Sequence, residues 1–559
     1  MSTIVTLTAA PAQERFHARS MVITQRGIVA TSQTLASQAG VEILRRGGSA
    51  IDAAIAANAV LGVVEPMSNG IGGDLFAIYR DAKSGELTGL NASGWSPRRL
   101  TPEFLAERGL PVMPQDGILS ATVPGCVDGW EKLHKRFGRL PWKELFVPAI
   151  YYAEHGFPVT EIIQGHWQDG FMKLSMSDYS RALFLPNGNA PNVGQIFRNP
   201  DLAKALRAVA DGGARAFYDG PVAQAILNTS QRLGGVFEPA DLKEFESEWV
   251  QPISGNYRGW EVFELPPNSQ GIAAIEMLHI LEEFPLSLYT PMSAEAFHLK
   301  IEAQKLAYED LQRYVGDPRF SRVPVSGLLS KEYASQRAKL IDREKANCDF
   351  TPGDPPGAGD TIYMTTIDGD GNLVSLIQSI YQSFGSGTVV DGMGFHLHNR
   401  AGLFTLEPGH PNVLAGRKRP FTTIIPAYMR KDNVHVGFGI MGGLNQAQAH
   451  AQFVSNFVDH GMNIQAALEA PRFTRLEFGG CGVMIEGRVP PEVRQALTRL
   501  GHQLDVRGDF SSWMGGGQAI LLDTASGTRY GASSPRKDGA AIPEPDPYFN
   551  PQTQQPTSR

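Results

Sequence analysis

One threonine in this chain has the surroundings of a residue that could act as nucleophile and base together. Thr361 follows a loop rich in proline and glycine, residues 351–360, and opens a β-branched and aromatic run that ends at Ile367. The loop predicts irregular structure and the run predicts a strand. Cleavage between Asp360 and Thr361 would leave the hydroxyl beside a free α-amine, which titrates at about 7.7–8.0. That amine could accept the hydroxyl proton near neutral pH.

The same stretch also has a structural interpretation, because loops that lead into threonine-rich strands are common. The run that begins at Thr361 is followed by a turn at residues 368–372 and by a second apolar run at residues 373–380. This pattern predicts a hairpin. Features elsewhere in the chain must therefore decide between a catalytic and a structural threonine.

Composition and charge indicate a globular protein without a nucleic-acid partner. The chain has 559 residues, with 50 Lys and Arg against 57 Asp and Glu, and the formal net charge is −7. The basic residues form no patch of the kind that binds nucleic acid. The longest apolar run, residues 53–64, is shorter than the roughly twenty residues of a membrane-spanning helix. The N-terminal residues lack the pattern of a secretory signal, so we expect a soluble, cytoplasmic protein without a membrane partner.

The cysteines and histidines predict no metal site and no cofactor. Cys126, Cys348 and Cys481 are few and widely spaced, which favours free thiols, buried or partly buried, in a reducing compartment. His396 and His398 lie two apart on a strand expected at residues 394–397 and would share a face. We expect them to be structural, because no third ligand is evident.

The elements that position Thr361 are expected to combine helices and strands. An alanine-rich helix at residues 50–64 follows a helix at residues 33–46, and its composition predicts close packing at the centre of the fold. Residues 100–345 are expected to be predominantly helical, and residues 1–20 and 540–559 to be loose. Strands are expected at 75–79, 361–367, 373–380, 394–397, 434–439 and 519–522, and later helices at 446–460, 464–470 and 491–500.

A glycine-rich loop at residues 69–74 could in principle bind a phosphate. A dinucleotide fingerprint would need a strand before the loop and a glycine where Leu75 stands. Neither is present, so the loop predicts a tight turn that lets another backbone segment approach closely.

Several short motifs, in this order along the chain, resemble the γ-glutamyltranspeptidase family. They lie at residues 48–54, 70–74, 123–125, 384–387, 418–423, 441–443 and 531–536, and the resemblance spans about 22–540. It implies an α+β fold of the N-terminal-nucleophile hydrolase class. That fold is an αββα sandwich, with two stacked, mainly antiparallel sheets between helix layers and a helical large-subunit portion. The resemblance also implies self-cleavage into a large subunit, residues 1–360, and a catalytic small subunit, residues 361–559.

The resemblance implies roles for individual residues. Thr361 corresponds to the family's nucleophile, and cleavage would fall between Asp360 and Thr361. Ser379 corresponds to a second hydroxyl, more usually a threonine, which hydrogen bonds to the nucleophile. Gly442 and Gly443 correspond to the tandem glycines whose N–H groups stabilise the oxyanion of the tetrahedral intermediate.

The positions that would bind the acyl group depart from the family pattern. Ser93 stands where the family has the arginine that holds the glutamyl α-carboxylate. Leu403 stands where the family has the aspartate that holds the α-ammonium. Tyr381 replaces an asparagine, and Thr422 and Thr423 replace a pair of serines.

Arg400 replaces a residue that the family keeps uncharged or acidic. Its planar fork could bind a substrate carboxylate in place of the missing arginine, or it could form a structural salt bridge with a nearby acid. Because burying an unpaired charge is costly, an acyl group without the α-amine would fit as well as glutamyl. The candidate substrate-binding residues are Arg400, Tyr381, Thr422, Thr423 and Ser93.

The sequence thus predicts a self-processing threonine amidohydrolase that cleaves γ-glutamyl amides such as glutathione through an acyl-Thr361 intermediate. Residues 404–417 form a short segment, so the lid loop of many transpeptidases is expected to be missing and hydrolysis is favoured over transfer. One alternative is a related acyl-amide hydrolase resembling cephalosporin acylase or oxamate hydrolase. Another is an unprocessed, non-catalytic homologue that binds a small acid. The expected partner is a small-molecule amide, and the two fragments are expected to stay associated, with a dimer of heterodimers as one option.

Overall fold

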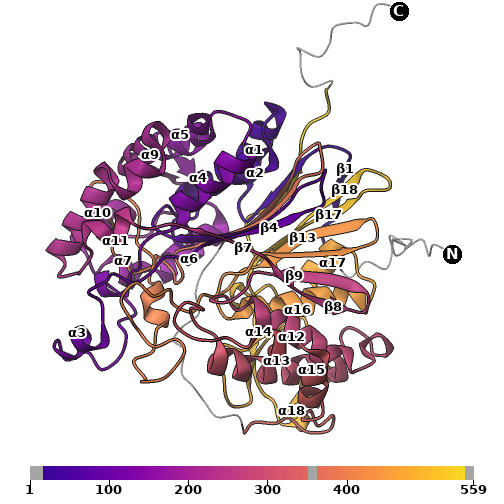
Figure 1. The fold of residues 1–559 in the computed structure, drawn as a ribbon. Helices are drawn as coiled ribbons and strands as arrows, with labels where there is room; N and C mark the ends of the chain where they lie inside the picture. The colour runs from indigo at the N-terminus through magenta and orange to yellow at the C-terminus, as the bar shows by residue number, and fades with distance from the viewer. Residues whose placement is uncertain (1–16, 350–361, 548–559) are drawn as a thin grey trace, which may run out of the picture.

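Two seven-stranded sheets face each other in a computed structural model that describes residues 17–349 and 362–547 (Figure 1). Every neighbouring pair of strands within them is antiparallel. The first sheet has the order β19 (Ala540–Pro543), β2 (Ile28–Thr31), β10 (Ile362–Ile367), β11 (Leu373–Ser379), β3 (Asp74–Arg80), β4 (Leu87–Ala92) and β7 (Glu248–Val250). The second has the order β1 (Val22–Thr24), β18 (Thr528–Ser533), β17 (Gly517–Asp523), β13 (Val434–Ile440), β12 (Ala427–Lys431), β9 (Trp260–Glu264) and β8 (Ile253–Tyr257).

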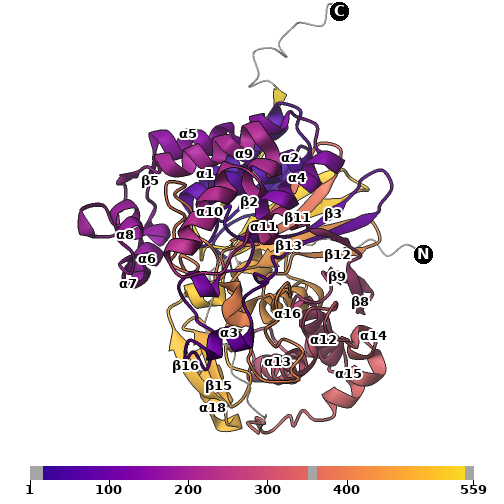
Figure 2. The same cartoon turned by 60° about the vertical axis from the view of Figure 1, so that its left-hand side comes forward.

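Helices cover the outer face of each sheet (Figures 1 and 2). The first sheet is covered by a layer that includes α1 (Thr34–Arg45), α2 (Ala50–Val64), α4 (Cys126–Phe137), α5 (Val147–His155) and α9 (Pro200–Tyr218). The second is covered by α12 (Gly271–Glu282), α13 (Ala294–Tyr314), α16 (Asn445–Val458) and α17 (Ile464–Glu469). The remaining α-helices are α3 (Pro102–Ala106), α6 (Glu161–Asp169), α7 (Phe171–Leu174), α8 (Asp178–Phe184), α10 (Pro221–Arg232), α11 (Pro239–Lys243), α14 (Val325–Leu328), α15 (Lys331–Ala338) and α18 (Pro491–Leu500).

Two small sheets lie outside the sandwich. One consists of β14 (Phe473–Thr474), β15 (Gly482–Glu486) and β16 (Gln503–Arg507), and the other of β5 (Phe157–Pro158) and β6 (Ile196–Phe197). Within the described ranges, no helix combines the length and the apolar character that a bilayer crossing requires.

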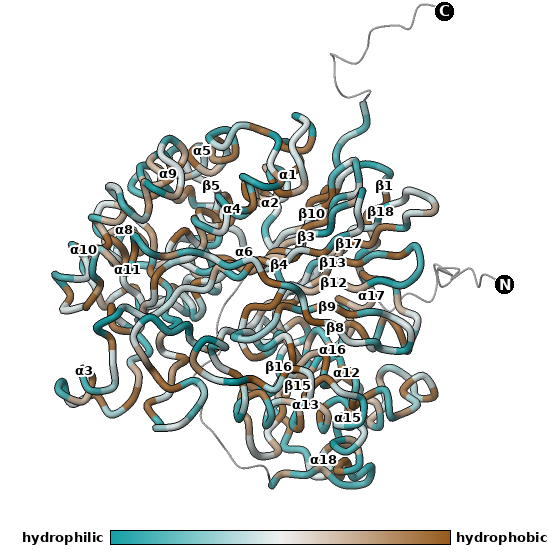
Figure 3. The backbone as a smooth tube through the Cα atoms, in the orientation of Figure 1, coloured by the Kyte–Doolittle hydropathy of each residue, from teal (hydrophilic) through white to brown (hydrophobic). Residues whose placement is uncertain are grey.

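The central strands are apolar on both faces because both faces are covered. On β11, Leu373 and Ile377 join the cluster between the two sheets, whereas Val374 and Leu376 join the cluster under the helices of the first layer. This arrangement explains why apolar residues of this strand point to both faces rather than alternating strictly with polar ones. Figure 3 shows the same concentration of apolar residues along the central strands.

The alanine-rich helix α2 packs against β10 and β11, as its composition predicted. Ser49 caps its N-terminus and forms a capping box with Asp52. The buried Asp52 carboxylate also accepts hydrogen bonds from the backbone N–H groups of Arg139 (2.8 Å) and Leu140 (3.1 Å). A single aspartate therefore joins the start of α2 to the loop that follows α4.

Three local predictions are wrong. Residues 394–397 form no strand, and only an isolated bridge joins His396 to Val389. Residues 540–543, expected to be loose, form β19 and pair with β2, where the sheet supplies partners for their backbone groups. Within the expected N-terminal arm, the N–H groups of Ala18 and Arg19 donate to the Glu469 carboxylate at 2.6 and 2.9 Å. Residues 1–16 and 548–559 lie outside the described ranges.

The prediction of free thiols is also wrong for two of the three cysteines. Cys348 and Cys481 form a disulfide with a Cα–Cα distance of 4.9 Å, whereas Cys126 is a buried free thiol. Sequence spacing could not reveal this pair because the partners are 133 residues apart. The prediction of a cytoplasmic location loses the support of the thiols, because disulfides persist mainly in oxidising compartments.

Candidate active site

The candidate site lies where β11 ends and β10 begins. Asp360 and Thr361 fall outside the described residues, so the cleavage site and nucleophile remain predictions. The next residue, Ile362, pairs with Gln378 on β11, and Ser379 is the last residue of that strand. The hairpin therefore brings Ser379 to the end of the sheet at which the chain enters β10.

The backbone around Ser379 is tightly packed. Its buried hydroxyl accepts a hydrogen bond from the Tyr381 N–H at 2.7 Å. A Cβ atom on Gly73 would lie 2.3 Å from the carbonyl oxygen of Ser379, and one on Gly72 would lie 2.0 Å from that of His396. Both glycines are therefore required by close backbone approach, which confirms the prediction for this loop.

Tyr381 has an unusual backbone conformation and lies over a cation. Its φ of +74° falls in the left-handed region, which costs a non-glycine residue about 1–3 kcal/mol. The Arg400 guanidinium carbon lies 4.8 Å from the centre of the Tyr381 ring. Burial raises the pKa of the Tyr381 hydroxyl, so the side chain is neutral.

Arg400 forms a buried salt bridge, which was one of the two predicted roles. Its Nε donates to Asp74 Oδ2 at 2.9 Å and its Nη2 donates to Asp74 Oδ1 at 3.3 Å. Its Nη1 donates to Thr423 Oγ1 at 2.7 Å. The Arg400 and Asp74 side chains are both fully buried. Asp74 therefore neutralises much of the charge that could attract a substrate carboxylate, and substrate binding by Arg400 stays a prediction.

The two predicted oxyanion glycines form the turn between β13 and α16. Gly442 and Gly443 have φ angles of +120° and +60°, which glycine adopts without strain. The Gln270 side chain donates to the carbonyl oxygens of Gly443, at 2.8 Å, and of Thr423. Because the turn precedes the N-terminus of α16, the helix dipole favours negative charge there.

A second amide side chain joins Ser93 to Thr422. Asn268 Nδ2 lies 3.2 Å from Ser93 Oγ and 3.3 Å from Thr422 Oγ1. Ser93 Oγ also donates to Asn91 Oδ1 at 2.7 Å. Ser93 therefore belongs to a buried hydrogen-bond network rather than standing as an isolated replacement for an arginine.

The structure brings together most of the predicted site. Contacts run from Ser379 through Tyr381, Arg400 and Thr423 to Gly443, by way of Gln270. Sequence reasoning missed three supporting side chains: Asp74, Asn268 and Gln270. Asp74 ends the glycine-rich loop already singled out, and a partner for Arg400 could have been sought there. Nothing in the local sequence identifies the two amides.

A pocket of about 590 Å³ adjoins this network, and its lining combines apolar side chains with polar ones that include Glu407 and His410. Leu403 and Phe421 line the pocket and share a buried hydrophobic cluster with Tyr381. Phe404 and Phe478 contribute further apolar surface. An apolar side chain thus lines a pocket at the position where the family pattern has an ammonium-binding aspartate.

His396 and His398 have different neighbours, as structural histidines would. The His396 ring packs 4.5 Å from the ring of Phe184, and His398 Nε2 lies 3.2 Å from Thr122 Oγ1. Burial lowers the pKa of His396 to about 3 and that of His398 to about 4, so both rings are neutral.

Comparison with known proteins decides the family. The family model for γ-glutamyltranspeptidase matches residues 36–544. The chain belongs to this family. It is 36% identical over 526 residues to the glutathione hydrolase-like YwrD proenzyme of Bacillus subtilis, with coverage of 93% of the chain and 99% of that protein. It is 34% identical over 540 residues to the glutathione hydrolase proenzyme of the same organism, with coverage of 92% and 91%.

A solved structure is also similar to this chain. The cephalosporin acylase from Bacillus halodurans superimposes with a TM-score of 0.88 at 41% identity, covering 96% of the chain and 99% of the acylase. The predicted αββα fold of an N-terminal-nucleophile hydrolase is thereby confirmed. The chain is an enzyme of the γ-glutamyltransferase type.

Proposed function

We propose that this γ-glutamyltranspeptidase-family enzyme is a self-processing amidohydrolase whose nucleophile is Thr361. The observation that carries the proposal is the buried chain of contacts from Ser379, at the end of β11, to Gly443, at the start of α16. It joins the predicted hydroxyl partner of the nucleophile to the predicted oxyanion donors. A threonine with a purely structural role would need neither a hydroxyl partner nor oxyanion donors beside it.

Processing would begin in the precursor. The Thr361 hydroxyl attacks the carbonyl carbon of Asp360, the peptide bond between the two residues breaks, and an ester replaces it. Breaking the peptide bond frees the α-amine of Thr361, and water then hydrolyses the ester to give the free Thr361 hydroxyl and the Asp360 carboxylate. The products are residues 1–360 and 361–559, and both sheets contain strands from each fragment.

The mature enzyme would use the freed amine as its base. Thr361 Oγ attacks the substrate amide carbonyl while the α-amine accepts the hydroxyl proton and then gives it to the departing amine. Gly442 and Gly443 N–H groups stabilise the oxyanion, and one such donor is typically worth about 2.7–4 kcal/mol. Water resolves the acyl-Thr361 ester and regenerates the enzyme.

The acyl pocket favours a group without an α-ammonium. Leu403 offers the ammonium no counter-charge, and the Arg400 charge is already paired with Asp74. An ammonium beside Leu403 would lose hydration without a charged partner at that position, and Glu407, the carboxylate among the residues that line the pocket, is an exposed side chain. A glutaryl-type acyl group therefore fits better than glutamyl, in keeping with the 41% identity to a cephalosporin acylase. γ-Glutamyl amides are the second candidate, and the two glutathione hydrolase relatives favour them.

Turnover of glutaryl-p-nitroanilide and γ-glutamyl-p-nitroanilide separates the two substrate classes. We expect a higher kcat/KM for the glutaryl compound, and we expect Leu403→Asp to shift the ratio toward the glutamyl compound by about tenfold, which corresponds to roughly 1.4 kcal/mol. A wild-type preference for γ-glutamyl would overturn the acyl assignment.

Thr361→Ala serves as the control for the nucleophile. It should remain a single full-length chain and hydrolyse neither anilide. A wild-type chain that stays uncut through long incubation would instead support the non-catalytic alternative, because the free amine would never form.

A further inference from the structure

We propose that the Cys348–Cys481 disulfide covalently joins the two fragments of the mature enzyme, and that a buried clamp beside it fixes the end of the large fragment. The inference rests on the proposed cleavage at Asp360–Thr361. Cys348 precedes that bond in the sequence and Cys481 follows it. Cutting the backbone there would leave this disulfide as the covalent link between the pieces.

The two cysteines come from different parts of the fold. Cys348 is exposed and lies near the end of the first described range, whereas Cys481 is 2% exposed and directly precedes β15. Their Cα atoms lie 4.9 Å apart, within the range that an unstrained disulfide spans. The bond would thus tie the large fragment's end to the sheet of β14, β15 and β16 in the small fragment.

Two buried charges on α13 hold the residue next to Cys348. Lys305 Nζ donates to the carbonyl oxygen of Asn347 at 2.8 Å, and the Asn347 N–H donates to Glu302 Oε2 at 3.1 Å. Lys305 and Glu302 also pair at 2.5 Å with both side chains buried. Lys305 Nζ lies 3.7 Å from Cys481 Sγ. The buried Lys305–Glu302 pair therefore binds both backbone polar groups of Asn347, the residue that precedes Cys348.

The neighbouring backbone is bonded to the small fragment. The Ala346 N–H donates to the carbonyl oxygen of Leu500 at 2.7 Å. The Gln503 N–H donates to the carbonyl oxygen of Cys481 at 2.8 Å. Residues 346–348 are thus joined by side chains, backbone and disulfide to a surface built from both fragments.

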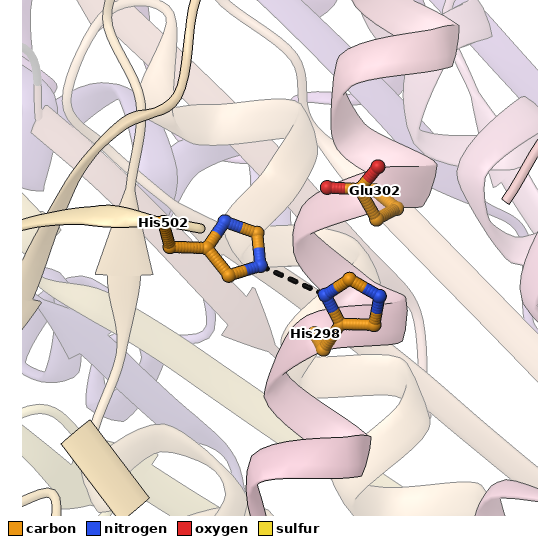
Figure 4. Close-up of side chains that lie close together, drawn as sticks. All are labelled: His298, Glu302 and His502. Carbon is orange, nitrogen blue, oxygen red and sulfur yellow. Dashed lines mark hydrogen bonds between the residues drawn. The ribbon is translucent and has the colours of Figure 1, made fainter. Parts of the chain in front are cut away.

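A histidine pair completes the clamp. His298 Nε2 lies 2.7 Å from the carbonyl oxygen of Asp342, so this nitrogen is the protonated donor and Nδ1 is the acceptor. His502 Nε2 then donates to His298 Nδ1 at 2.8 Å. Figure 4 shows the two rings facing each other, with Glu302 on the same helix as His298. His298 belongs to the large fragment and His502 to the small one.

The same side chains could be considered as metal ligands, since one atom from each of His298, Glu302 and His502 lies within 4.8 Å of the others. The buried Lys305 ammonium on Glu302 opposes a second cation by direct repulsion. The hydrogen bonds of His298 already use both of its nitrogens. The cluster therefore fits a clamp between fragments better than a metal site.

Forming the disulfide requires an oxidant. Exchange with a small-molecule disulfide balances the reaction: two thiols of the protein become one S–S bond, and the oxidant is reduced to two thiols.

Electrophoresis of the processed enzyme with and without reductant tests the link. Free thiols are first alkylated, and the sample is then denatured. We expect one species of full-chain size without reductant and two fragments with it. Cys348→Ser and Cys481→Ser should each give two fragments without reductant, whereas Cys126→Ser, the matched control, should behave as the wild type. Separation of the wild-type fragments without reductant, with Cys348 and Cys481 both alkylated, would overturn the proposal.

Peptide mapping keeps failure of the disulfide distinct from failure of cleavage. A chain that runs as one band under both conditions has not been cut, which refutes the processing step and with it the role as inter-fragment link. Mass spectrometry of an unreduced digest then detects the disulfide bond directly. A linked peptide pair containing Cys348 and Cys481 supports the clamp, and two alkylated peptides refute it.

Discussion

At the scale of single residues, Ser379 carries the hydroxyl that is predicted to hydrogen bond to the nucleophile, Thr361. It accepts a hydrogen bond from the Tyr381 N–H and is fully buried. Ser379→Ala should slow both processing and anilide hydrolysis by about 100-fold, the lower end of general acid–base effects. Ser379→Thr, which keeps the hydroxyl, is the matched control and should stay within a few-fold of the wild type. Equal activity of the alanine and threonine variants would remove Ser379 from the site.

Asp74 illustrates how a buried charge depends on its partner. Asp74→Asn would leave the Arg400 guanidinium buried and uncompensated, and breaking such a pair typically costs about 3–5 kcal/mol. Urea unfolding should show that loss in the free energy of unfolding. Asp178→Asn breaks the exposed Arg181–Asp178 pair and should change stability far less. Similar effects of the two variants would mean that Arg400 is solvated or paired elsewhere.

At the scale of elements, the start of α2 depends on Asp52. Its carboxylate accepts from the N–H groups of Ser49, Arg139 and Leu140. Asp52→Ala should cost about 2–4 kcal/mol, because it removes charge-assisted bonds and leaves buried donors unsatisfied. Ser330→Ala at the N-cap of α15 should cost only about 1 kcal/mol. Chemical denaturation measures both, and a loss at Asp52 no larger than that at Ser330 would contradict the bridging role.

Long helices and strands with a strong hydrophobic pattern could be predicted from the sequence. Short strands, and contacts between residues far apart in the sequence, could not. The sequence identified α2, the β10–β11 hairpin and β13 because their periodicity and turn residues act locally. It missed β8 and β9, which lie in the stretch expected to be mainly helical and are only five residues long each. Only β8 shows an alternation of buried with exposed positions, whereas β9 is almost entirely buried.

Some residues of the candidate site could likewise be predicted from the sequence, and others could not. Ser379, Gly442 and Gly443 could be placed from motif order. Asp74 lies in the motif at residues 70–74, but its pairing with Arg400 could not be predicted, and neither could the role of Gln270. Their partners are remote in the sequence, and only the folded chain brings them together.

At the scale of the whole molecule, buried histidines should make stability depend on pH. Burial lowers the pKa of seven histidines to about 3 or 4: His279, His396, His398, His435, His450, His460 and His502. The unfolded chain, with an ordinary histidine pKa of about 6.5, binds more protons than the folded chain between roughly pH 4 and 6.5. Stability is therefore present above pH 6.5 and falls as the pH drops through this window.

Two buried glutamates act in the opposite sense. Burial raises the pKa of Glu264 and Glu276, so the folded state retains their protons above pH 4.5. The histidines outnumber them, and each histidine contributes a slope of about 1.4 kcal/mol per pH unit. Urea unfolding at pH 7.5, 6 and 5 should show a steady decrease in the free energy of unfolding. A flat profile over that range would show that the histidines are solvated.

The interleaving of residues 1–360 with residues 361–559, the two fragments of the proposed cleavage, should hold the mature enzyme together even without the disulfide. In the first sheet, β2 and β3 of the large fragment flank the β10–β11 hairpin of the small fragment, and β19 of the small fragment pairs with β2. In the second sheet, β1 pairs with β18 and β9 pairs with β12. Separating the fragments would break all five of these strand pairings and expose the core between the sheets, which is a cost comparable to unfolding.

A processed Cys348→Ser/Cys481→Ser variant tests that expectation. It should elute as one particle in native size-exclusion chromatography with reductant present, and its fragments should separate only in denaturant. The wild type in the same buffers, with and without reductant, is the control. Separation of the variant on simple dilution would mean that the strand pairings are too weak to hold the fragments and that the disulfide carries the association. Co-elution would assign the disulfide a narrower role, which is to fix the large fragment's end beside β15.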